Sequence, residues 1–284
     1  MNYILVNFGE IPSHLKFCIK NIEKVDKNSN IILATDKSTS IEDIQNINLE
    51  EIDTPYLNEI DESIKNLNYF DNEENILWEA SLKRIFAILD VALMLDIDNF
   101  VHFDNDVLIY KSFNELQNEF SKEKINITQV SNIFLNFSYS YFPKILLLKN
   151  LADKVFEIFS NVEFYEKKYY EGNRLNEMVI LNIVYKLEPT LFNILNSLPN
   201  KKSSILFDPA SYGQYLSGFH NKKKSRKKRL KEMSTNQYLG EDMYINKYKP
   251  EFKKTGPIVR YENKTYEVAN LHIHNKKLKK YLIK

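Results

Sequence analysis

Two carboxylates one residue apart, Asp104 and Asp106, stand between two apolar runs within residues 100–110. A short apolar run is typical of a strand that is buried on both faces, and ligands of open α/β sheets bind outside the carboxyl ends of such strands. Two acids at that point can hold Mg²⁺ or Mn²⁺ through hard oxygen ligands, and the metal can bridge substrate phosphates. The alternative is a surface turn, in which Asp and Asn are common.

A second pair with the same spacing, Asp96 and Asp98, competes with the first. It follows a helix predicted over residues 78–95 and precedes the apolar strand, so it lies at the amino end of that strand. Asp104 and Asp106 follow the strand and therefore lie on the ligand-binding side of the sheet. Chain direction favours the later pair and assigns the earlier one to a helix–strand turn.

Near the C-terminus, His272 and His274 alternate with two apolar residues. On a strand, this alternation places both imidazoles on one face. Lys276 and Lys277 follow after Asn275. The pattern fits either a plain pair of surface histidines or an end-piece that binds metal and phosphate.

One arginine and two further acids are candidate site residues. Arg84 lies in the predicted helix 78–95, where it could face the site or pair with Glu79 or Asp90. Glu177 precedes an apolar helix at 179–187. The helix dipole favours an acid there, whereas an acid at the mouth of a cleft could orient an acceptor hydroxyl or act as a general base.

Asp208 opens a stretch that holds two of the six glycines, Gly213 and Gly218. In a chain with so little glycine, clustered glycines suggest a backbone that needs special angles or a close approach to a ligand. No G-x-x-x-x-G-K or G-x-G-x-x-G pattern is present, which argues against a P-loop or dinucleotide fold. Bound phosphates must therefore be met by a metal and by Lys, Arg or His.

The strands and helices predicted to position these residues indicate an α/β fold. Strands are predicted at 3–8, 30–34 and 47–52, with helices at 13–25 and 56–68, which is the opening of a parallel, nucleotide-binding sheet. Further strands are expected at 125–130 and 133–137, and an amphipathic helix within 143–159. Aromatic side chains cluster between residues 134 and 142. Core packing is favoured for them, and a platform for sugar rings is the alternative.

Bulk properties set the broad class. The 284 residues permit one large α/β domain or two small ones, and the net charge of +1 steers no partner. The single cysteine, Cys18, excludes an intrachain disulfide and a Cys-rich zinc site, and a cytoplasmic location fits. The first residues lack the features of a signal peptide, and no stretch is apolar enough for a spanning helix.

Residues 222–231 carry eight basic side chains in ten. Such a run is usually a solvated loop, and here it is expected to divide the body from the C-terminal segment. The alternatives are contact with an anionic membrane surface or with a polyanionic substrate. A nucleic-acid partner is not expected, because no known nucleic-acid motif accompanies the run.

Taken together, these stretches resemble GT-A glycosyltransferases, the nucleotide-sugar-dependent enzymes with an Asp-X-Asp motif. More narrowly, they look like bacterial and viral GT-A proteins with an Arg-bearing helix, an acid-Asn-Asp motif, a later Asp…Gly-Gln-Tyr-Leu stretch and a closing His-X-His-Ser-Lys-like segment. The matching residues, in the same order over most of the chain, are Arg84, Asp104-Asn105-Asp106, Asp208 with Gly213-Gln214-Tyr215-Leu216, and His272-Ile273-His274-Asn275-Lys276. Asn275 stands where a serine is expected, which puts only a minor contact in doubt.

The resemblance implies a Rossmann-like mixed central sheet flanked by helices, with the C-terminal segment closing over the site. It implies one domain over 1–284, divided into a nucleotide-binding half (1–110), an acceptor half (111–219), a basic loop (220–231) and a closing segment (232–284). β-Strand ends would place Phe8 and Gly9 near the nucleoside, with Asp36 after the second strand.

In the broader glycogenin-like group, both acids of the motif and a C-terminal histidine bind Mn²⁺, which bridges the diphosphate. The resemblance carries this role to Asp104, Asp106 and one of His272 or His274. Imidazole with carboxylates suits Mn²⁺ better than Mg²⁺. A lysine after the histidine would neutralise the leaving diphosphate, which indicates Lys276 or Lys277.

Arg84 would meet the diphosphate or the donor sugar. An inverting enzyme needs a general base, for which Asp208 and Glu177 are the candidates. In a retaining enzyme the leaving phosphate can take the proton, and the sequence leaves this choice open.

The expected function is a metal-dependent glycosyltransferase of the hexosyltransferase kind, which moves a sugar from a nucleotide-sugar, UDP-linked by preference, to a glycan, lipid-linked or protein acceptor in glycoconjugate synthesis. One alternative is a sugar-phosphate nucleotidyltransferase, although residues 7–12 lack the Gly-rich loop with which such enzymes open. The other is a non-catalytic protein that binds polyanions through residues 222–231. The expected location is cytoplasmic, with the basic run as a candidate for peripheral membrane contact.

Overall fold

A seven-stranded mixed sheet forms the centre of the computed structural model, which describes residues 1–70, 76–199, 203–217, 231 and 236–283. The strands in spatial order are β3 (Gln45–Asn48), β2 (Asn30–Thr35), β1 (Asn2–Asn7), β4 (Phe100–Phe103), β7 (Leu135–Phe142), β6 (Ile125–Gln129) and β8 (Phe192–Ile194). The four strands from β3 to β4 are parallel, whereas β7 runs antiparallel to both β4 and β6. The predicted α/β class with a mixed central sheet is confirmed.

The strands at the centre of the sheet contribute to two hydrophobic cores, one on each face. In β1, Ile4 and Val6 belong to one core, and Tyr3 and Leu5 belong to the other. Successive side chains of a strand point to opposite faces, so both faces of β1 are covered. This coverage explains the unbroken apolar run in the sequence.

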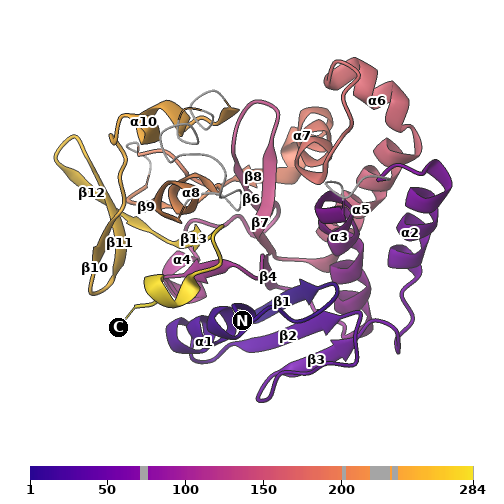
Figure 1. Cartoon of the computed structure of the whole chain (residues 1–284), viewed down its shortest axis with the longest axis horizontal. Coiled ribbons are helices and arrows are strands. Elements are labelled where there is room, and N and C mark those ends of the chain that lie inside the picture. Colours follow the sequence, from indigo (N-terminus) through magenta and orange to yellow (C-terminus); the bar gives the residue numbers. More distant parts are fainter. Residues whose placement is uncertain (71–75, 200–202, 218–230, 232–235, 284) are drawn as a thin grey trace.

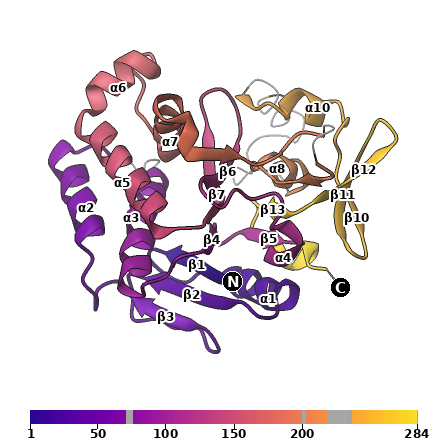
Figure 2. The ribbon, with the colours of Figure 1, turned by 180° about the vertical axis from the view of Figure 1, so that it is seen from behind.

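Helices cover both faces of the sheet (Figures 1 and 2). One core is shared by α2 (Pro55–Leu67), α3 (Ile76–Met94), α5 (Ile145–Ser160) and α7 (Glu177–Leu187), and α6 (Val162–Tyr169) follows α5. The opposite core contains α1 (Leu15–Val25) together with C-terminal segments. The strongest predicted helix is confirmed as α3, with its apolar face buried.

The C-terminal part forms a second, four-stranded sheet beside the central one. Its strands in spatial order are β10 (Glu251–Lys253), β11 (Gly256–Tyr261), β12 (Lys264–Val268) and β9 (Ile205–Leu206). Short helices among the described residues include α4 (Phe113–Leu116), α8 (Ser211–Ser217), α10 (Gly240–Tyr244) and the 3₁₀ turns η2 (Pro189–Leu191) and η3 (Leu278–Tyr281).

A two-stranded antiparallel ladder joins the C-terminal segment to the middle of the chain. In it, β13 (Asn270–His272) pairs with β5 (Val107–Ile109), so that His272 lies opposite Val107. The Ile273 N–H also donates to the Asp106 carbonyl at 2.8 Å. Figure 2 shows β13 of the C-terminal segment beside β5. The predicted closure of the C-terminal segment over the acid pair is thus observed.

Two predicted boundaries differ from the structure. The strand expected at 133–137 continues as β7 to Phe142, because Ser138 and Ser140 are buried as well and the polar residues do not mark a turn. The third strand is β3 at Gln45–Asn48 rather than 47–52. The aromatic cluster packs mostly in the core, as favoured, since Phe137 and Phe142 are buried.

The basic run at 222–231 is almost entirely outside the described residues, which include only Lys231 from it. Among the helices of the described ranges, none combines the length and apolar character needed to cross a membrane.

Candidate active site

The loop between β4 and β5 carries the acid pair to the carboxyl edge of the sheet. The Asp104 N–H donates to the Ser138 carbonyl at 3.1 Å, which ties the start of the loop to β7. The Asn105 amide donates to the Val6 carbonyl at 3.2 Å and to Asn7 Oδ1 at 3.0 Å. The middle residue of the motif therefore fixes the loop to the carboxyl end of β1 and leaves the two acids on either side.

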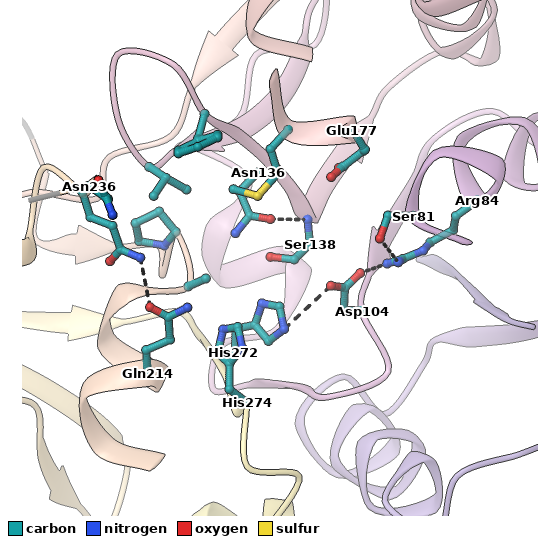
Figure 3. A pocket seen from close by; sticks show the side chains of 16 residues that line it. Ser81, Arg84, Asp104, Asn136, Ser138, Glu177, Gln214, Asn236, His272 and His274 are labelled. Carbon is teal, nitrogen blue, oxygen red and sulfur yellow. Dashed lines mark hydrogen bonds and ion pairs between the residues drawn. The ribbon is translucent and has the colours of Figure 1, made fainter. Parts of the chain in front are cut away.

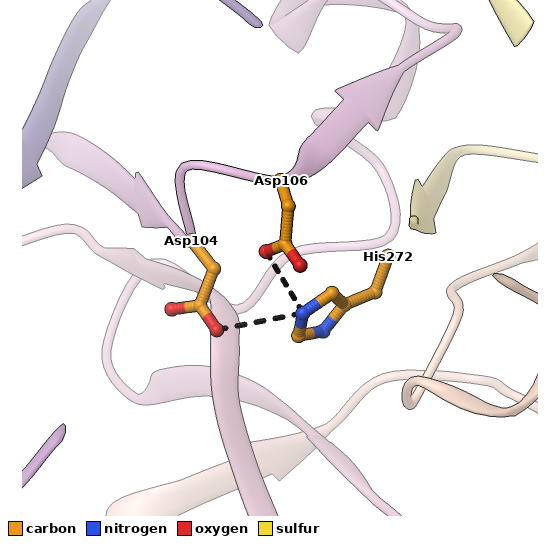
Figure 4. Close-up of side chains that lie close together, drawn as sticks. All are labelled: Asp104, Asp106 and His272. Atoms are coloured by element: carbon orange, nitrogen blue, oxygen red, sulfur yellow. Dashed lines mark ion pairs between the residues drawn. The ribbon is translucent and has the colours of Figure 1, made fainter. Parts of the chain in front are cut away.

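Asp104, Asp106 and His272 converge at this edge (Figure 4). His272 Nε2 lies 2.9 Å from Asp106 Oδ1 and 3.7 Å from Asp104 Oδ2. One ligand atom from each residue lies within 4.8 Å of the others. The ring of His274 stacks on that of His272 with centroids 4.2 Å apart. Of the two predicted histidines, His272 is the one placed to complete a ligand set.

Arg84 reaches the acid pair from α3. Its guanidinium forms an ion pair with Asp104, and Nη2 donates to Ser81 Oγ at 3.3 Å. The alternative partners on the helix are engaged elsewhere: Glu79 lies 3.6 Å from Lys83, and Asp90 accepts backbone N–H groups of α2. Arg84 therefore faces the site.

Lys276 is the second cation of the site, and its ammonium forms an ion pair with Asp106. Lys277 is exposed and lines neither cavity of the site. Burial alone would raise the pKa of Asp106, but His272, Lys276 and His274 together hold that pKa well below its ordinary value. The carboxylate is thus ionised, as a metal ligand must be.

The residues present fit a divalent cation. Two carboxylates and an imidazole offer oxygen and nitrogen ligands, a set that suits Mn²⁺ better than Mg²⁺. Both acids point at the same imidazole nitrogen, as Figure 4 shows. The β13–β5 ladder fixes His272 relative to Asp106.

Asp208 holds His272 in place through its backbone. Its fully buried carboxylate accepts the N–H groups of Tyr212 (2.9 Å), Gly213 (2.9 Å) and His272 (3.0 Å). Burial raises the pKa of Asp208, and these backbone donors oppose the rise. Asp208 lines neither cavity of the site, so the structure places this candidate base as an anchor between α8 and β13.

Gly213 allows α8 to approach β13 this closely. A Cβ atom at this position would lie 1.9 Å from the carbonyl oxygen of His272 and 3.0 Å from Asp208 Oδ2. No side chain fits there without a shift of the backbone. The clustered glycines suggested special backbone angles or a close approach to a ligand, and at Gly213 the close approach is between two segments of the backbone. Gly218 lies outside the described residues.

Two cavities meet at the acid–histidine cluster. The β1 cavity, of about 340 Å³, is lined by the end of β1 and by Phe8, His14, Asp106 and Lys276. The α7 cavity, of about 260 Å³, lies on the other side, and Figure 3 shows polar side chains directed into it. Both cavities are lined by Ser81, Arg84, Asp104, His272 and His274. The acid–histidine cluster thus lies at the boundary between the two cavities and lines both of them.

Glu177 lines the α7 cavity from the first turn of α7, where the Asn176 side chain caps the helix by accepting the Val179 N–H at 3.1 Å. Burial raises the pKa of Glu177 to about 7, and Arg84 and a backbone hydrogen bond from Phe137 limit the rise. A carboxyl that titrates near neutrality can accept or donate a proton. Glu177 is therefore the better placed of the two candidate bases.

Of the three residues predicted near the nucleoside, the structure places one at a cavity of the site and two behind it. Phe8 lines the β1 cavity, and Lys83 Nζ lies 5.7 Å from the centre of its ring. Gly9 and Asp36 do not line it. Instead, the Gly9 N–H donates to Asp36 Oδ1 at 2.6 Å, and Gly9 has a φ of +77°, so the pair shapes the loop behind Phe8.

Several lining residues were not predicted from the sequence. Ser81 stands one helical turn before Arg84 and could have been found from that spacing. Gln214 lies within the Gly-Gln-Tyr-Leu stretch, whose match drew attention to it without a role. The others gave no signal, because only the fold brings them to the cavities; the lining residues concerned are Ser81, Gln214, His14, Asn136, Ser138 and Gln237.

Comparison of the sequence with family models and with curated proteins does not assign the chain to a family. A family model described as nucleolar protein 12 (25 kDa) matches residues 196–251, which is too small a part of the chain to assign it to that family. The matched stretch contains the basic run at 222–231. A search of curated proteins finds no match.

Comparison of structures finds sugar transferases at low similarity. The apo form of mouse xyloside xylosyltransferase 1 aligns with a TM-score of 0.47 and 11% identity over 69% of this chain and 86% of that one. The galactosyltransferase LgtC, in complex with donor and acceptor sugar analogs, aligns with 0.44 and 11% over 81% and 82%. GlyE of Streptococcus pneumoniae aligns with 0.42 and 10% over 69% and 45%. Values in this range do not establish a shared activity.

Proposed function

We propose that the chain is a glycosyltransferase of the GT-A kind, which uses a divalent cation and a nucleotide-sugar donor, UDP-linked by preference. The observation that carries the proposal is the convergence of Asp104, Asp106 and His272 at the carboxyl edge of the sheet, between two cavities. The order of the matching motifs along the chain supports the same assignment.

The two cavities share the acid–histidine cluster and Arg84, and their remaining side chains suit two different substrates. The β1 cavity is lined by Arg84, Lys276 and His14, which favour a nucleoside diphosphate. Four carboxamides line the α7 cavity and not the β1 cavity, and they suit sugar hydroxyls; they belong to Asn136, Gln214, Asn236 and Gln237. We therefore assign the donor to the β1 cavity and the acceptor to the α7 cavity, with the reacting atoms near Asp104.

The residues of the chain have distinct tasks in this proposal. Asp104, Asp106 and His272 hold the cation, Mn²⁺ by preference, which supplies positive charge to the diphosphate when bound. Arg84 and Lys276 are fixed beside it and stabilise the negative charge that develops as the glycosidic bond breaks. Their positions are set by the fold before the substrate arrives, so little reorganisation is needed.

Glu177 is the residue that would take the proton of the acceptor hydroxyl if the reaction inverts configuration. Of the two acids that line the α7 cavity, Asp104 is paired with Arg84, which leaves Glu177 for this task. In a retaining reaction, Glu177 would orient the acceptor instead. A glycan, lipid-linked or protein acceptor, used in glycoconjugate synthesis in the cytoplasm, agrees with this division of the site.

The assignment is tested with Asp104→Asn and Asp106→Asn. The wild-type chain should hydrolyse a UDP-sugar in the presence of Mn²⁺, and each variant should lose about 10²-fold or more of that rate, because one oxygen ligand of the cation is removed. Thermal shift with UDP-, GDP- and CMP-sugars, with and without Mn²⁺, identifies the donor first. Unchanged turnover in both variants would sink the assignment.

A matched control is Asp96→Asn in the competing pair. Asp96 has a φ of +50°, a conformation that asparagine tolerates, and it lies at the opposite end of β4. The variant should retain full turnover.

Release of UDP rather than pyrophosphate separates a glycosyltransferase from a nucleotidyltransferase. Deletion of residues 222–230 should leave UDP-sugar binding intact, whereas it would abolish binding by a polyanion-binding protein.

A further inference from the structure

A third cavity, of about 240 Å³, lies beyond the α7 cavity and takes no part in the proposed chemistry. We call it the Tyr238 cavity. Its walls include Tyr238, Leu198, Pro209, Asn196 and Gln129. No charged side chain is among the described residues that line it.

The Tyr238 cavity continues the α7 cavity along three segments of the chain. Pro209 lines both. Gln129 lines the Tyr238 cavity while its neighbour Val130 lines the α7 cavity. In the same way, Tyr238 follows Gln237, which lines the α7 cavity. Three separate walls that run from one hollow to the next place the two side by side.

The wall that carries Tyr238 is held in place. The Tyr238 N–H donates to the Val130 carbonyl at 2.8 Å, and its hydroxyl bonds to Asn132 Oδ1 at 2.5 Å. Despite both bonds, the Tyr238 side chain is 42% exposed, and Leu198 is 38% exposed. An aromatic ring that is fixed yet open to solvent is a preformed surface for a ligand.

The chemistry of the walls indicates an uncharged ligand with both apolar and hydroxyl groups. An aromatic ring and Leu198 suit the C–H face of a sugar ring, and the Gln129 carboxamide suits its hydroxyls. A lipid chain would cover the Gln129 carboxamide without offering it a hydrogen bond, which is unfavourable. A charged peptide would find no countercharge on the walls described here.

The size of the cavity argues for one unit of a larger ligand. Sites for whole small molecules usually measure roughly 300–1,000 Å³, and this cavity is smaller. We propose that the Tyr238 cavity is a second acceptor subsite, which holds an uncharged sugar unit next to the unit that receives the transferred sugar. The inference rests on the proposed function and adds to it that the acceptor is an oligosaccharide.

The test compares acceptors of different length with the full chain. Mn²⁺-dependent transfer from a UDP-sugar is measured with methyl glucoside, methyl galactoside and methyl N-acetylglucosaminide, and with methyl maltoside, lactoside and chitobioside. At least one disaccharide should have a KM about tenfold below that of its monosaccharide. Tyr238→Ala should raise that KM about five- to tenfold, as expected for a lost aromatic contact, and leave the KM of the monosaccharide within about twofold.

Two further variants keep the test decisive. Leu198→Arg fills the cavity from an exposed position and should remove the preference for the disaccharide even if Tyr238→Ala folds poorly. Phe164→Ala removes an exposed aromatic ring of α6, outside all three cavities, and should change neither KM. Thermal unfolding confirms that each variant is folded.

The possible failures are distinguishable. Mn²⁺-dependent donor hydrolysis with no preference for any disaccharide, or an equal rise of both KM values in Tyr238→Ala, overturns the subsite and leaves the proposed function standing. A wild-type chain that hydrolyses no UDP-sugar overturns the proposed function, and the subsite with it.

Discussion

At the scale of single residues, Glu177 is the side chain whose protonation is set close to neutral pH. Burial beside the α7 cavity raises its pKa to about 7, although Arg84 opposes the rise. If Glu177 accepts the proton of the acceptor hydroxyl, kcat/KM should increase with pH through about 7, because only the ionised form is a base. Glu177→Gln should remove this inflection and lower transfer by about 10²- to 10⁴-fold.

The same group gives a second readout on folding. Its pKa is higher in the folded chain than the ordinary 4.5, so the folded state binds the proton more tightly, and stability falls as pH rises through about 7. Glu177→Gln mimics the protonated form. The free energy of unfolding of the variant, relative to that of wild type, should therefore increase from pH 5 to pH 8 by an amount on the order of 1–3 kcal/mol. Equal pH profiles of transfer and of unfolding in both proteins would contradict the assignment.

Gly213 is the residue at which a single methyl group should disturb the proposed metal site. In Gly213→Ala the new Cβ would meet the His272 carbonyl, and the resulting shift of His272 should weaken Mn²⁺ binding about tenfold or more. Overpacking should also lower stability by about 1–3 kcal/mol. Calorimetric titration with Mn²⁺ and thermal unfolding measure the two effects.

Gly172→Ala is the matched control for this substitution. Gly172 has a φ of +77°, and no atom lies within 4 Å of the position that a Cβ would take, so alanine there costs about 1–2 kcal/mol of backbone strain without touching the site. Its Mn²⁺ affinity should equal that of wild type. Equal losses of affinity in the two variants would show that general destabilisation, and not displacement of His272, is the cause.

At the scale of elements, Asp208 joins α8 to β13. Its carboxylate accepts three backbone N–H groups, one of them from His272. Asp208→Asn leaves one oxygen for these donors and should cost about 1–3 kcal/mol of stability. Mn²⁺ affinity should fall about 10- to 100-fold, as is usual when the support of a ligand is lost.

Asp90→Asn provides the comparison, because Asp90 is a buried carboxylate that also accepts backbone N–H groups but belongs to neither cavity of the site. Asp90 accepts the Leu57 N–H at 2.8 Å and the Tyr56 N–H at 3.3 Å at the start of α2. The variant should lose stability to a similar degree but keep its Mn²⁺ affinity, measured by the same titration. If Asp208→Asn also retains wild-type affinity, Asp208 has no role in positioning His272.

The sequence was most informative where local pattern and local structure coincide. The apolar face of α3, the buried strand β4 and the position of Asp104 and Asp106 after it all follow from periodicity and chain direction, and the structure agrees. The task of Asp208 could not be predicted, because its partners are backbone groups whose approach depends on the packing of α8 against β13. The length of β7 was missed because its buried serines look like the residues of a turn.

At the scale of the whole molecule, the features that eluded prediction are those assembled from distant segments. The α7 cavity draws its walls from α3, β7, α7 and the segment around Gln237, and the Tyr238 cavity adds the stretch 194–198 to three segments that continue from the α7 cavity. Only the tail histidines were anticipated at such range, and there the resemblance of the motifs supplied what periodicity did not. The position of the acid–histidine cluster between two cavities became visible only with the fold.

The ladder between β5 and β13 has a consequence for the order in which the protein folds during its synthesis. Lys276 and Asp106 are 170 positions apart in the chain, so their ion pair cannot form until the segment that carries Lys276 has left the ribosome. The parallel strands β1, β2 and β4 can pair much earlier, because they lie within the first 103 residues. Contacts of such long range also form slowly, since a long loop must close first. A nascent chain would therefore form the parallel strands of the central sheet first and the acid–histidine cluster later.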